Sequence, residues 1–224
     1  MRAKRFAMPA VVSADEWRIA RSSLLEKEKA ATRQLDMLAA ERRRLPMVRL
    51  DREYLFHGAR GRVSMLDLFS GRRQLIAYHF MFAPDWSSAC PGCARRIDDL
   101  GHLAHLHARD TNFVVTALAP YSRLAELRRQ KRWTVLFYSS ADSTFNADMG
   151  VSGEAGEDFG ISVFFRDEGA GIYRSYFTTG RGVEPSGFRH LLDMTPYGRQ
   201  EEWEDSPAGW PQSPTHGWGS ARDG

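Results

Sequence analysis

The sequence predicts an α/β fold in which a mixed β-sheet is covered by helices on both faces. Two apolar runs, at residues 75–82 and 113–120, have the length of strands and are far shorter than the ~20 residues of a membrane-spanning helix. Nearly continuous apolar runs are typical of strands that are buried on both faces of a sheet. Helical segments alternate with the first strands, which favours parallel pairing, and the last two strands are close enough to pair antiparallel. The prediction is a three-layer sandwich.

The N-terminal segment is predicted to form one long, charged helix. Ser13 and Glu16 form a capping box, in which each side chain accepts a hydrogen bond from the other residue's amide. We expect the helix to run from about residue 14 to residue 44, because Pro46 then stops it. Its apolar stripe consists of Trp17, Ala20, Leu24, Ala31, Leu35 and Leu38. Such a stripe must cover something, so the helix is expected to pack on the chain's own domain or to form a homodimer.

The other elements follow from apolar patterns and from turn residues. In chain order they are a β-hairpin at residues 48–56 and 62–65, a helical turn at 66–69, a strand at 74–82, a helix at 90–107, a strand at 112–119, a helix at 122–131, a strand at 133–138, a long loop at 139–160, strands at 162–166 and 172–177, and a helix at 186–192. We therefore expect an N-terminal arm and long helix over residues 1–46, a folded domain over 47–195 and an irregular tail over 196–224.

Composition and charge are those of an ordinary folded protein. Hydrophobic residues make up 42% and charged residues 26% of the 224 residues. The net charge is +3 and the pI is near 9.0, but apart from residues 42–44 the arginines are interleaved with acids, so we expect no nucleic-acid surface. Pro9 interrupts the short apolar run near the N-terminus, which argues against a signal peptide. We expect a cytoplasmic protein without a membrane anchor.

Both cysteines of the chain, Cys90 and Cys93, belong to one Cys-Pro-Gly-Cys motif. The motif follows a predicted buried strand and a short loop, and it opens a predicted helix. Free amides at a helix N-terminus favour a thiolate, and thiolates in such motifs have pKa values of ~3.5–7.5 instead of about 8.5. We expect Cys90 to be the nucleophile that forms a mixed disulfide with a substrate. Cys93, one helical turn further, is expected to resolve that disulfide.

Residues around the motif are candidate neighbours of the site. Pro91 suits the first helical position, where its missing N–H costs nothing, whereas Gly92 loosens the first turn. Trp86 is equally suited to an apolar lip for a partner and to a core anchor. Asp85 is expected to cap the loop. The alternative is that it accepts a proton from the resolving thiol. Tyr121 follows a predicted strand at the sheet edge where α/β folds bind ligands.

Zinc is the alternative ligand chemistry for the cysteines. Cys90, Cys93, His102 and His105 are an ordered set of zinc-ligand types. On one continuous helix, however, Cys93 and His102 would be ~13 Å apart by helix rise, which is too far for a tetrahedral site. We therefore expect no metal and no bound cofactor. His79, on a buried strand, is expected to be a hydrogen-bonded core histidine and not a catalytic one.

The stretch at residues 78–86, followed by Cys90 and Cys93, resembles a bacterial family of thioredoxin-like proteins labelled as a domain of unknown function (number 899). Segments at residues 66–69, 138–140, 160–167 and 192–196 support the resemblance in the same order, and it covers about residues 11–200. The resemblance implies a thioredoxin-like fold with a long N-terminal helical extension. It also implies dithiol–disulfide exchange, an assignment that rests largely on fold and motif.

The chain departs from the broader relatives at two places. Thioredoxins have a cis-proline where this chain has Ile161, which argues against protein disulfides as substrates. Peroxiredoxins carry Pro-x-x-x-Thr-x-x-Cys, whereas here Pro84 lies six residues before Cys90 and Ser88 replaces the threonine. We expect a thiol–disulfide oxidoreductase that uses a thiol or disulfide substrate and a reductant, either a protein dithiol or glutathione. A peroxiredoxin-like thiol peroxidase and a non-enzymatic redox switch stay open as alternatives.

Overall fold

The structure is a computed structural model that describes residues 7–167, 169, 171–180, 197 and 200–214. Its contacts divide the chain into two units, which are described separately. One unit combines Met1–Pro46 with Leu192–Ser213, and the other combines Met47–Leu191 with Pro214–Gly224. We call Met47–Leu191 the sheet domain. The helix predicted at residues 186–192 lies outside the described residues.

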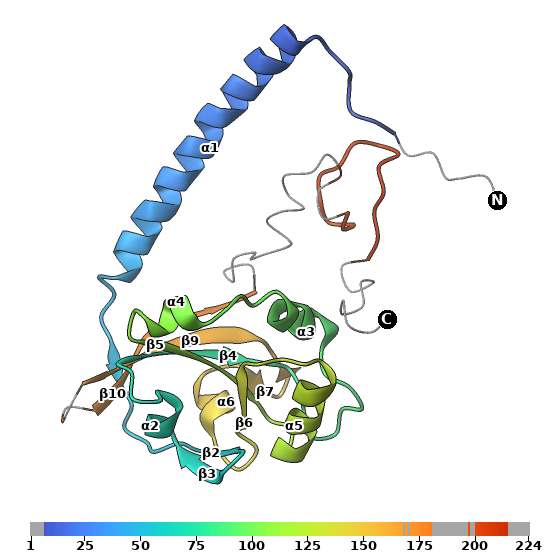
Figure 1. Cartoon of the computed structure of the whole chain (residues 1–224). Coiled ribbons are helices and arrows are strands. Elements are labelled where there is room, and N and C mark those ends of the chain that lie inside the picture. Colours follow the sequence, from blue (N-terminus) through green and yellow to red (C-terminus); the bar gives the residue numbers. More distant parts are fainter. Residues whose placement is uncertain (1–6, 168, 170, 181–196, 198–199, 215–224) are drawn as a thin grey trace. The chain divides into compact units, whose positions relative to one another are not determined.

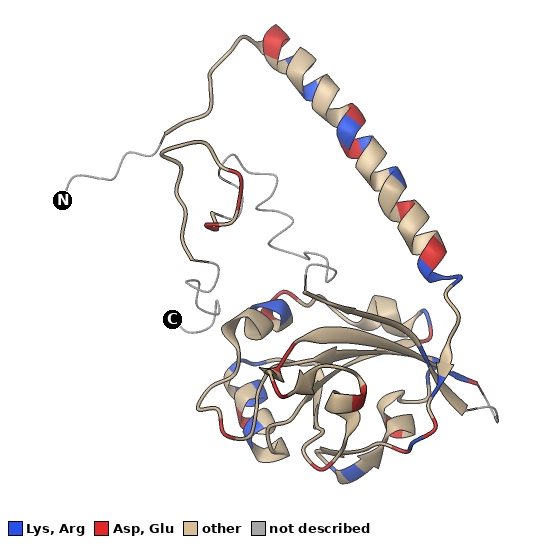
Figure 2. Ribbon diagram, turned by 180° about the vertical axis from the view of Figure 1, so that it is seen from behind, with Lys and Arg blue, Asp and Glu red and all other residues tan. Residues whose placement is uncertain are grey.

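The first unit contains the long charged helix, α1 (Ala14–Arg42), which confirms the predicted element to within two residues of its end. The capping box is present: Ser13 Oγ accepts from the Glu16 amide at 3.3 Å, and the Ser13 amide donates to Glu16 Oε2 at 2.9 Å. No residue of α1 is buried. Ion pairs along the helix join Arg18 with Asp15, Arg21 with Glu28, and Lys29 with Glu26. Figure 2 shows both signs of charge interleaved along α1. A homodimer formed through this helix stays a prediction.

Part of the predicted tail belongs to the same unit as the N-terminal arm. The Tyr197 hydroxyl donates to the carbonyl oxygen of Ala7 at 3.0 Å, and the Ala7 amide donates to the carbonyl oxygen of Gly209 at 3.2 Å. The Tyr197 ring packs edge-on against Trp210 with 5.4 Å between centroids. None of the described helices, α1 included, is both long and apolar enough to cross a membrane.

The sheet domain is built on an eight-stranded mixed sheet with the order β1-β10-β9-β4-β5-β6-β2-β3 (Figure 1). Its strands are β1 (Val48–Arg49), β2 (Leu55–Gly58), β3 (Gly61–Ser64), β4 (Gln74–His79), β5 (Thr111–Ala117), β6 (Leu136–Ser139), β9 (Gly160–Asp167) and β10 (Gly171–Thr179). β4, β5 and β6 are parallel, whereas β9 is antiparallel to both β4 and β10. The predicted mixed sheet and its antiparallel last pair are confirmed.

Helices cover both faces of this sheet, as the sequence predicts. They are α2 (Met65–Leu68), α3 (Pro91–Asp98), α4 (Ala104–His107), α5 (Tyr121–Gln130) and α6 (Phe145–Asp148). One core cluster joins α3 and α5 to the sheet through Cys93, Ile97 and Leu124, and the other joins α2 and α6 through Leu68 and Phe145. Because side chains alternate along a strand, β4 contributes to both clusters. The result is a three-layer sandwich.

The helix predicted at residues 90–107 is wrong in its extent, because the chain forms two helices there. α3 ends at Asp98, and α4 begins only at Ala104. Gly101 lies between them, and glycine is the weakest helix former after proline. His102 Nδ1 accepts a hydrogen bond from the Ala104 amide at 3.1 Å, which satisfies a free donor at the start of α4.

The strand predicted at residues 48–56 is also wrong, since it consists of two strands that pair with different partners. β1 pairs with β10 at one edge of the sheet, and β2 forms a hairpin with β3. The polar residues Asp51, Arg52 and Glu53 separate them. A strand needs an apolar face to stay in one sheet position, and this polar break allows the chain to cross between the two edges.

The loop predicted at residues 139–160 is the third correction. It contains α6 and a small separate hairpin of β7 (Ser152–Gly153) and β8 (Gly156–Glu157). Phe145, in α6, is fully buried, with its ring 5.2 Å from that of Tyr54 and 5.0 Å from that of Phe56. Met149 and Val151 are buried in the same cluster, so contacts with the core order a segment that shows no apolar periodicity.

Replacing Phe145 with Ala is expected to lower the free energy of unfolding by about 3–5 kcal/mol, because it leaves a cavity in this core cluster. Urea unfolding followed by circular dichroism measures the change. Leu136→Ala is the control, since this side chain is 42% exposed and should cost less than about 1 kcal/mol. Similar losses in the two variants would show that α6 is not part of the core.

His79 is a buried histidine on the face of β4 opposite the cysteines. Its Nε2 lies 2.7 Å from Ser162 Oγ, and its ring lies 5.3 Å from the ring of Phe145. Burial, together with the positive charge of Arg174, lowers the pKa of His79 from 6.5 to about 3. The prediction of a hydrogen-bonded core histidine is confirmed.

The free energy of unfolding should therefore decrease as the pH falls from about 6.5 to about 3. In this window the unfolded chain binds a proton on His79 while the folded chain keeps the ring neutral, so stability is lost at up to about 1.4 kcal/mol per pH unit from this group. Urea unfolding at several pH values, in the wild type and in His79→Asn, isolates its share. Parallel pH profiles for the two proteins would contradict the assignment.

Candidate functional site

The two cysteines lie where β4 leads through a loop into α3, as the sequence predicts. Cys90 is the N-cap residue of α3, and Pro91 occupies the first helical position. Neither cysteine forms a disulfide; Cys90 is half-buried, and Cys93 is only 3% exposed. The backbone of Met81 contacts both residues, because its carbonyl oxygen accepts from the Cys90 amide at 3.1 Å and its N–H donates to the sulfur of Cys93. Gly92, between the two cysteines, is half-buried.

The sulfur of Cys93 is hydrogen-bonded to the sulfur of Cys90 and to the hydroxyl of Tyr78. The pKa of Cys93 is raised, first because its thiol donates to Cys90, then because it is buried, and also because of the negative charge on Cys90. Cys93 therefore keeps its proton more firmly than an ordinary thiol. Cys90 makes no side-chain capping bond to the first turn of α3, and the thiol of Cys93 is the donor to it instead.

An aromatic core supports α3 from the sheet. The Trp133 indole N–H donates to Asp98 Oδ1 at 2.8 Å, which fixes the C-terminal end of the helix. Trp133 is stacked on Phe137 at 5.5 Å, and Phe80 packs edge-on against both rings at 6.1 and 5.5 Å. Edge-to-face and stacked pairs of this kind add to the energy of burial. Cys93 belongs to the same core cluster, so its position is set by rigid packing.

Two of the predicted neighbours pack against the cluster that contains Cys93. Trp86, in the loop before Cys90, is half-buried against it, an arrangement that suits a core anchor with one exposed edge. Ile161, on β9, also packs against this cluster and is in register with Tyr78 of β4. These residues come from different elements and meet on one face of the sheet.

Three other predicted neighbours lie in the turn after β4 and at the start of α5. Pro84 and Asp85 are exposed in the turn after β4. Tyr121, the first residue of α5, is not among the hydrophobic side chains of the cysteine cluster. The pKa of Tyr138, in the cluster on the opposite face, is raised mainly by burial and also by the charge of Tyr121. A role for Tyr121 beside the cysteines stays a prediction.

Arg123, on α5, holds the loop before Cys90 and is not among the predicted site residues. Its guanidinium lies 4.4 Å from the centroid of the Phe82 ring. It donates to three carbonyl oxygens of the loop, namely those of Pro84 at 2.9 Å, Trp86, and Ser87 at 3.3 Å. In the sequence Arg123 is one arginine among several on a basic helix, so no local signal distinguishes it.

Replacing Arg123 with Met should destabilise the protein by about 1–3 kcal/mol, since carbonyl groups bonded to a cation lose their donor. The loop at residues 84–88 should then exchange its amide hydrogens faster, as measured by hydrogen–deuterium exchange with mass spectrometry. Arg129→Met is the matched control on the same helix, where Arg129 pairs only with exposed Glu126 at 2.7 Å. Equal exchange of the loop in both variants would contradict the role of Arg123.

The zinc-ligand set is not brought together. Within the described part of the chain, no group of three or more His, Cys, Asp or Glu side chains is placed to hold a metal ion. His102 and His105 belong to the α4 region, beyond the break that follows α3. The break invalidates the expected distance along one continuous helix, but the four side chains still do not converge.

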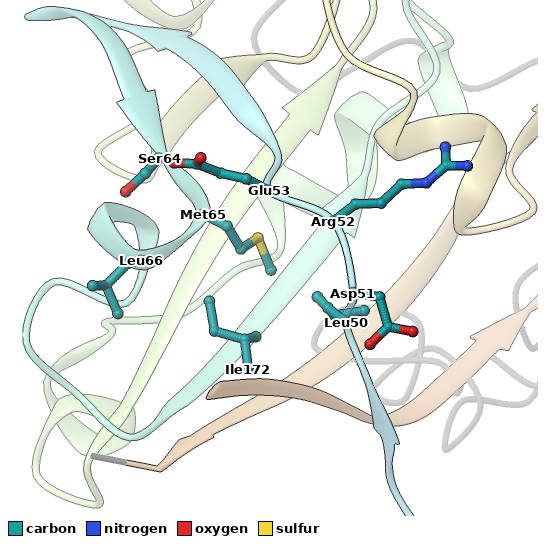
Figure 3. A pocket seen from close by; sticks show the side chains of 8 residues that line it. All are labelled: Leu50, Asp51, Arg52, Glu53, Ser64, Met65, Leu66 and Ile172. Atoms are coloured by element: carbon teal, nitrogen blue, oxygen red, sulfur yellow. The ribbon is translucent and has the colours of Figure 1, made fainter. Parts of the chain in front are cut away.

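A pocket of about 360 Å³ lies elsewhere in the sheet domain (Figure 3). It is lined by Leu50, Asp51, Arg52, Glu53, Ser64, Met65, Leu66 and Ile172. Figure 3 shows the apolar side chains of Leu50, Met65 and Ile172 directed toward one another, while Arg52 extends away from them. Arg52 reaches Asp148 of α6 at 3.5 Å. Since neither cysteine lines this pocket, it is separate from the cysteine site.

The three-layer sandwich, with a cysteine pair where a central strand leads into a helix, defines a protein of the thioredoxin-like fold. The chain belongs to the family described as bacterial protein of unknown function (DUF899), whose model matches residues 6–220. This finding confirms the resemblance that the sequence motifs carry.

Several solved structures are similar at low identity. Peroxidoxin BcpB from Mycobacterium tuberculosis is 18% identical with a TM-score of 0.42, over 54% of this chain and 77% of that one. AhpC from M. tuberculosis is 12% identical with a TM-score of 0.43, over 66% and 89%. An uncharacterized thioredoxin-like protein from Porphyromonas gingivalis is 18% identical with a TM-score of 0.37, over 62% and 82%. No curated protein matches the chain.

Proposed function

We propose that the chain is a thiol–disulfide oxidoreductase whose reacting groups are Cys90 and Cys93. The observation that carries this proposal is a pair of thiols of unequal burial at the start of a helix, in which the thiol of Cys93 donates a hydrogen bond to the sulfur of Cys90. A half-buried sulfur at a helix N-terminus is suited to attack, because the helix dipole favours negative charge there. A buried sulfur beside it is suited to the second, intramolecular step.

In the proposed reaction, the Cys90 thiolate attacks one sulfur of a substrate disulfide. The substrate S–S bond breaks, and the first substrate thiolate leaves and takes a proton. Cys93 then loses its proton and attacks the sulfur of Cys90, which releases the second substrate thiolate. The substrate gains two electrons, and the protein is left with a Cys90–Cys93 disulfide. A protein dithiol or glutathione is the proposed reductant that restores the two thiols.

The surroundings of Cys90 favour a substrate with an apolar part. Trp86 and Ile161 are half-buried on the same face of the sheet as the cysteines, and we assign them as the apolar neighbours of the bound substrate. Pro91 and Gly92 set the spacing of the two sulfurs at the start of α3. A reducing compartment such as the cytoplasm suits this chemistry, since free thiols persist there.

The test is turnover of a small disulfide, such as oxidised glutathione or 5,5′-dithiobis(2-nitrobenzoate), with dithiothreitol as reductant. Cys90→Ser should reduce turnover to the rate without protein, because no nucleophile remains. Cys93→Ser, mixed with one equivalent of the disulfide and no dithiothreitol, should release one substrate thiol and leave a mixed disulfide at Cys90, which mass spectrometry identifies. Ser88→Ala, in the same loop, is the matched control and should retain turnover.

Other results would contradict the proposed roles or indicate a different function. Full turnover in Cys90→Ser, or a mixed disulfide on Cys93, would overturn the proposed roles. Rapid consumption of a hydroperoxide without disulfide reduction would identify a thiol peroxidase, in which Cys90 is oxidised to a sulfenic acid and Cys93 resolves it. Neither activity, together with a change of oligomeric state on oxidation, would identify a redox switch.

A further inference from the structure

Tyr78 is a buried tyrosine that contacts the reacting sulfurs. It lies on β4 between Ile161 of β9 and Val115 of β5 in the strand register, and it is 1% exposed. Its hydroxyl is hydrogen-bonded to the sulfur of Cys93. Buried tyrosine hydroxyls normally find a partner, but here the partner is a group that must change its charge in the proposed reaction.

We infer that Tyr78 prepares Cys93 for the resolving step by donating a hydrogen bond from its hydroxyl to the Cys93 sulfur, where negative charge forms. The inference rests on the proposed function and deepens it. Two donors are directed at this sulfur, the Tyr78 O–H and the Met81 N–H. A hydrogen bond to a charged acceptor is stronger than one to a neutral acceptor, so both donors favour the thiolate over the thiol.

Tyr78 remains a donor throughout the reaction. Burial and the negative charges of Cys93 and Cys90 raise the pKa of Tyr78 well above its usual value. The guanidinium of Arg96, on α3, lies 5.9 Å from the centroid of the Tyr78 ring, and its positive charge acts in the opposite direction. The balance keeps the hydroxyl protonated, so Tyr78 stabilises charge without transferring its own proton.

The same contacts make the two cysteines react in order. While Cys90 is a thiolate, it raises the pKa of Cys93 both as a hydrogen-bond acceptor and as a charge. Once Cys90 is in a mixed disulfide, the charge is gone and the acceptor is weaker. Burial is then the one remaining effect that raises the pKa of Cys93, and the hydrogen bonds from Tyr78 and Met81 lower it. Cys93 therefore becomes more acidic after Cys90 has reacted, at the moment when its thiolate is needed.

The resolving step balances without a further reactant. The Cys93 proton goes to the departing substrate sulfur, and the Cys93 thiolate attacks the sulfur of Cys90. A bond forms between the two protein sulfurs, and the bond between Cys90 and the substrate breaks with its electron pair on the substrate sulfur. Tyr78 holds the developing charge on Cys93 until the bond has formed.

Single-turnover reaction of the reduced protein with 5,5′-dithiobis(2-nitrobenzoate) separates the two steps. The first thionitrobenzoate is released when Cys90 attacks, and the second when Cys93 resolves the adduct. Tyr78→Phe should leave the first phase unchanged and slow the second roughly three- to tenfold, because a lost bond to a charged acceptor is partly offset by the higher nucleophilicity of a more basic thiolate. The slowing should persist at each pH from 6 to 8.

Tyr138→Phe is the matched control, since it removes a half-buried tyrosine hydroxyl from the cluster on the opposite face of the sheet. It should leave both phases unchanged. A second phase as fast in Tyr78→Phe as in the wild type, or equally slowed in Tyr138→Phe, would overturn the inference. Circular dichroism and thermal unfolding establish that the variants are folded.

A second measurement does not depend on the proposed function. In Cys90→Ala the only thiol is Cys93, and its rate of reaction with methyl methanethiosulfonate at fixed pH reports the thiolate fraction. Adding Tyr78→Phe should slow this reaction by a similar factor, whereas adding Tyr138→Phe should not. If the wild type released no second thionitrobenzoate, the proposed function would fail, and this comparison would still decide whether Tyr78 stabilises the Cys93 thiolate. No slowing here would overturn the inference.

Discussion

The proposed chemistry depends on one hydrogen bond, which the thiol of Cys93 donates to the sulfur of Cys90. It makes two identical side chains unequal, since one keeps its proton and the other can carry charge. Burial enforces the difference, because a buried sulfur loses the hydration that would stabilise its charge. The backbone of Met81 holds both residues, so the asymmetry is built into the end of β4 and the start of α3.

The strand β4 supplies this asymmetry and also isolates it from the rest of the core. Tyr78 and His79 are adjacent in sequence, and strand geometry directs them to opposite faces. Tyr78 donates to the sulfur of Cys93, whereas His79 is bonded to Ser162 in the other cluster and stays neutral. These two neighbouring residues are thus buried for different reasons. Tyr78 supports the sulfur of Cys93, whereas His79 packs in the opposite cluster.

The parts of the fold that depend on local chemistry could be predicted from the sequence. The capping box at Ser13 and Glu16, the buried strands and the position of the cysteine motif each follow from residue type and spacing. The segment around Phe145 could not, because its order comes from contacts with rings that are distant in the sequence. The break after α3 depends on Gly101 and on a cap from His102, which weak helix propensities do not resolve.

The site itself shows the same division. The two cysteines could be predicted because their chemistry is encoded in their spacing. Arg123 could not, since what it does depends on carbonyl groups of a loop that is more than thirty residues away, which only the folded chain places beside it. Tyr121 begins α5, directly after the strand β5, and its place beside the cysteines stays a prediction. Strand order predicts the edge of a sheet, and the rotation of the following helix decides which side chains reach the site.

All residues that carry the proposed reaction and its support belong to the sheet domain. The long helix α1 is stabilised within itself, by its capping box and by ion pairs such as Arg21 with Glu28 at 3.0 Å. Its 29 residues exceed the ~12–15 below which isolated helices are marginal. The cap and the ion pairs of α1 lie within the helix itself. These contacts are polar, so they leave the apolar stripe of α1 unexplained, and the homodimer that would cover it stays a prediction.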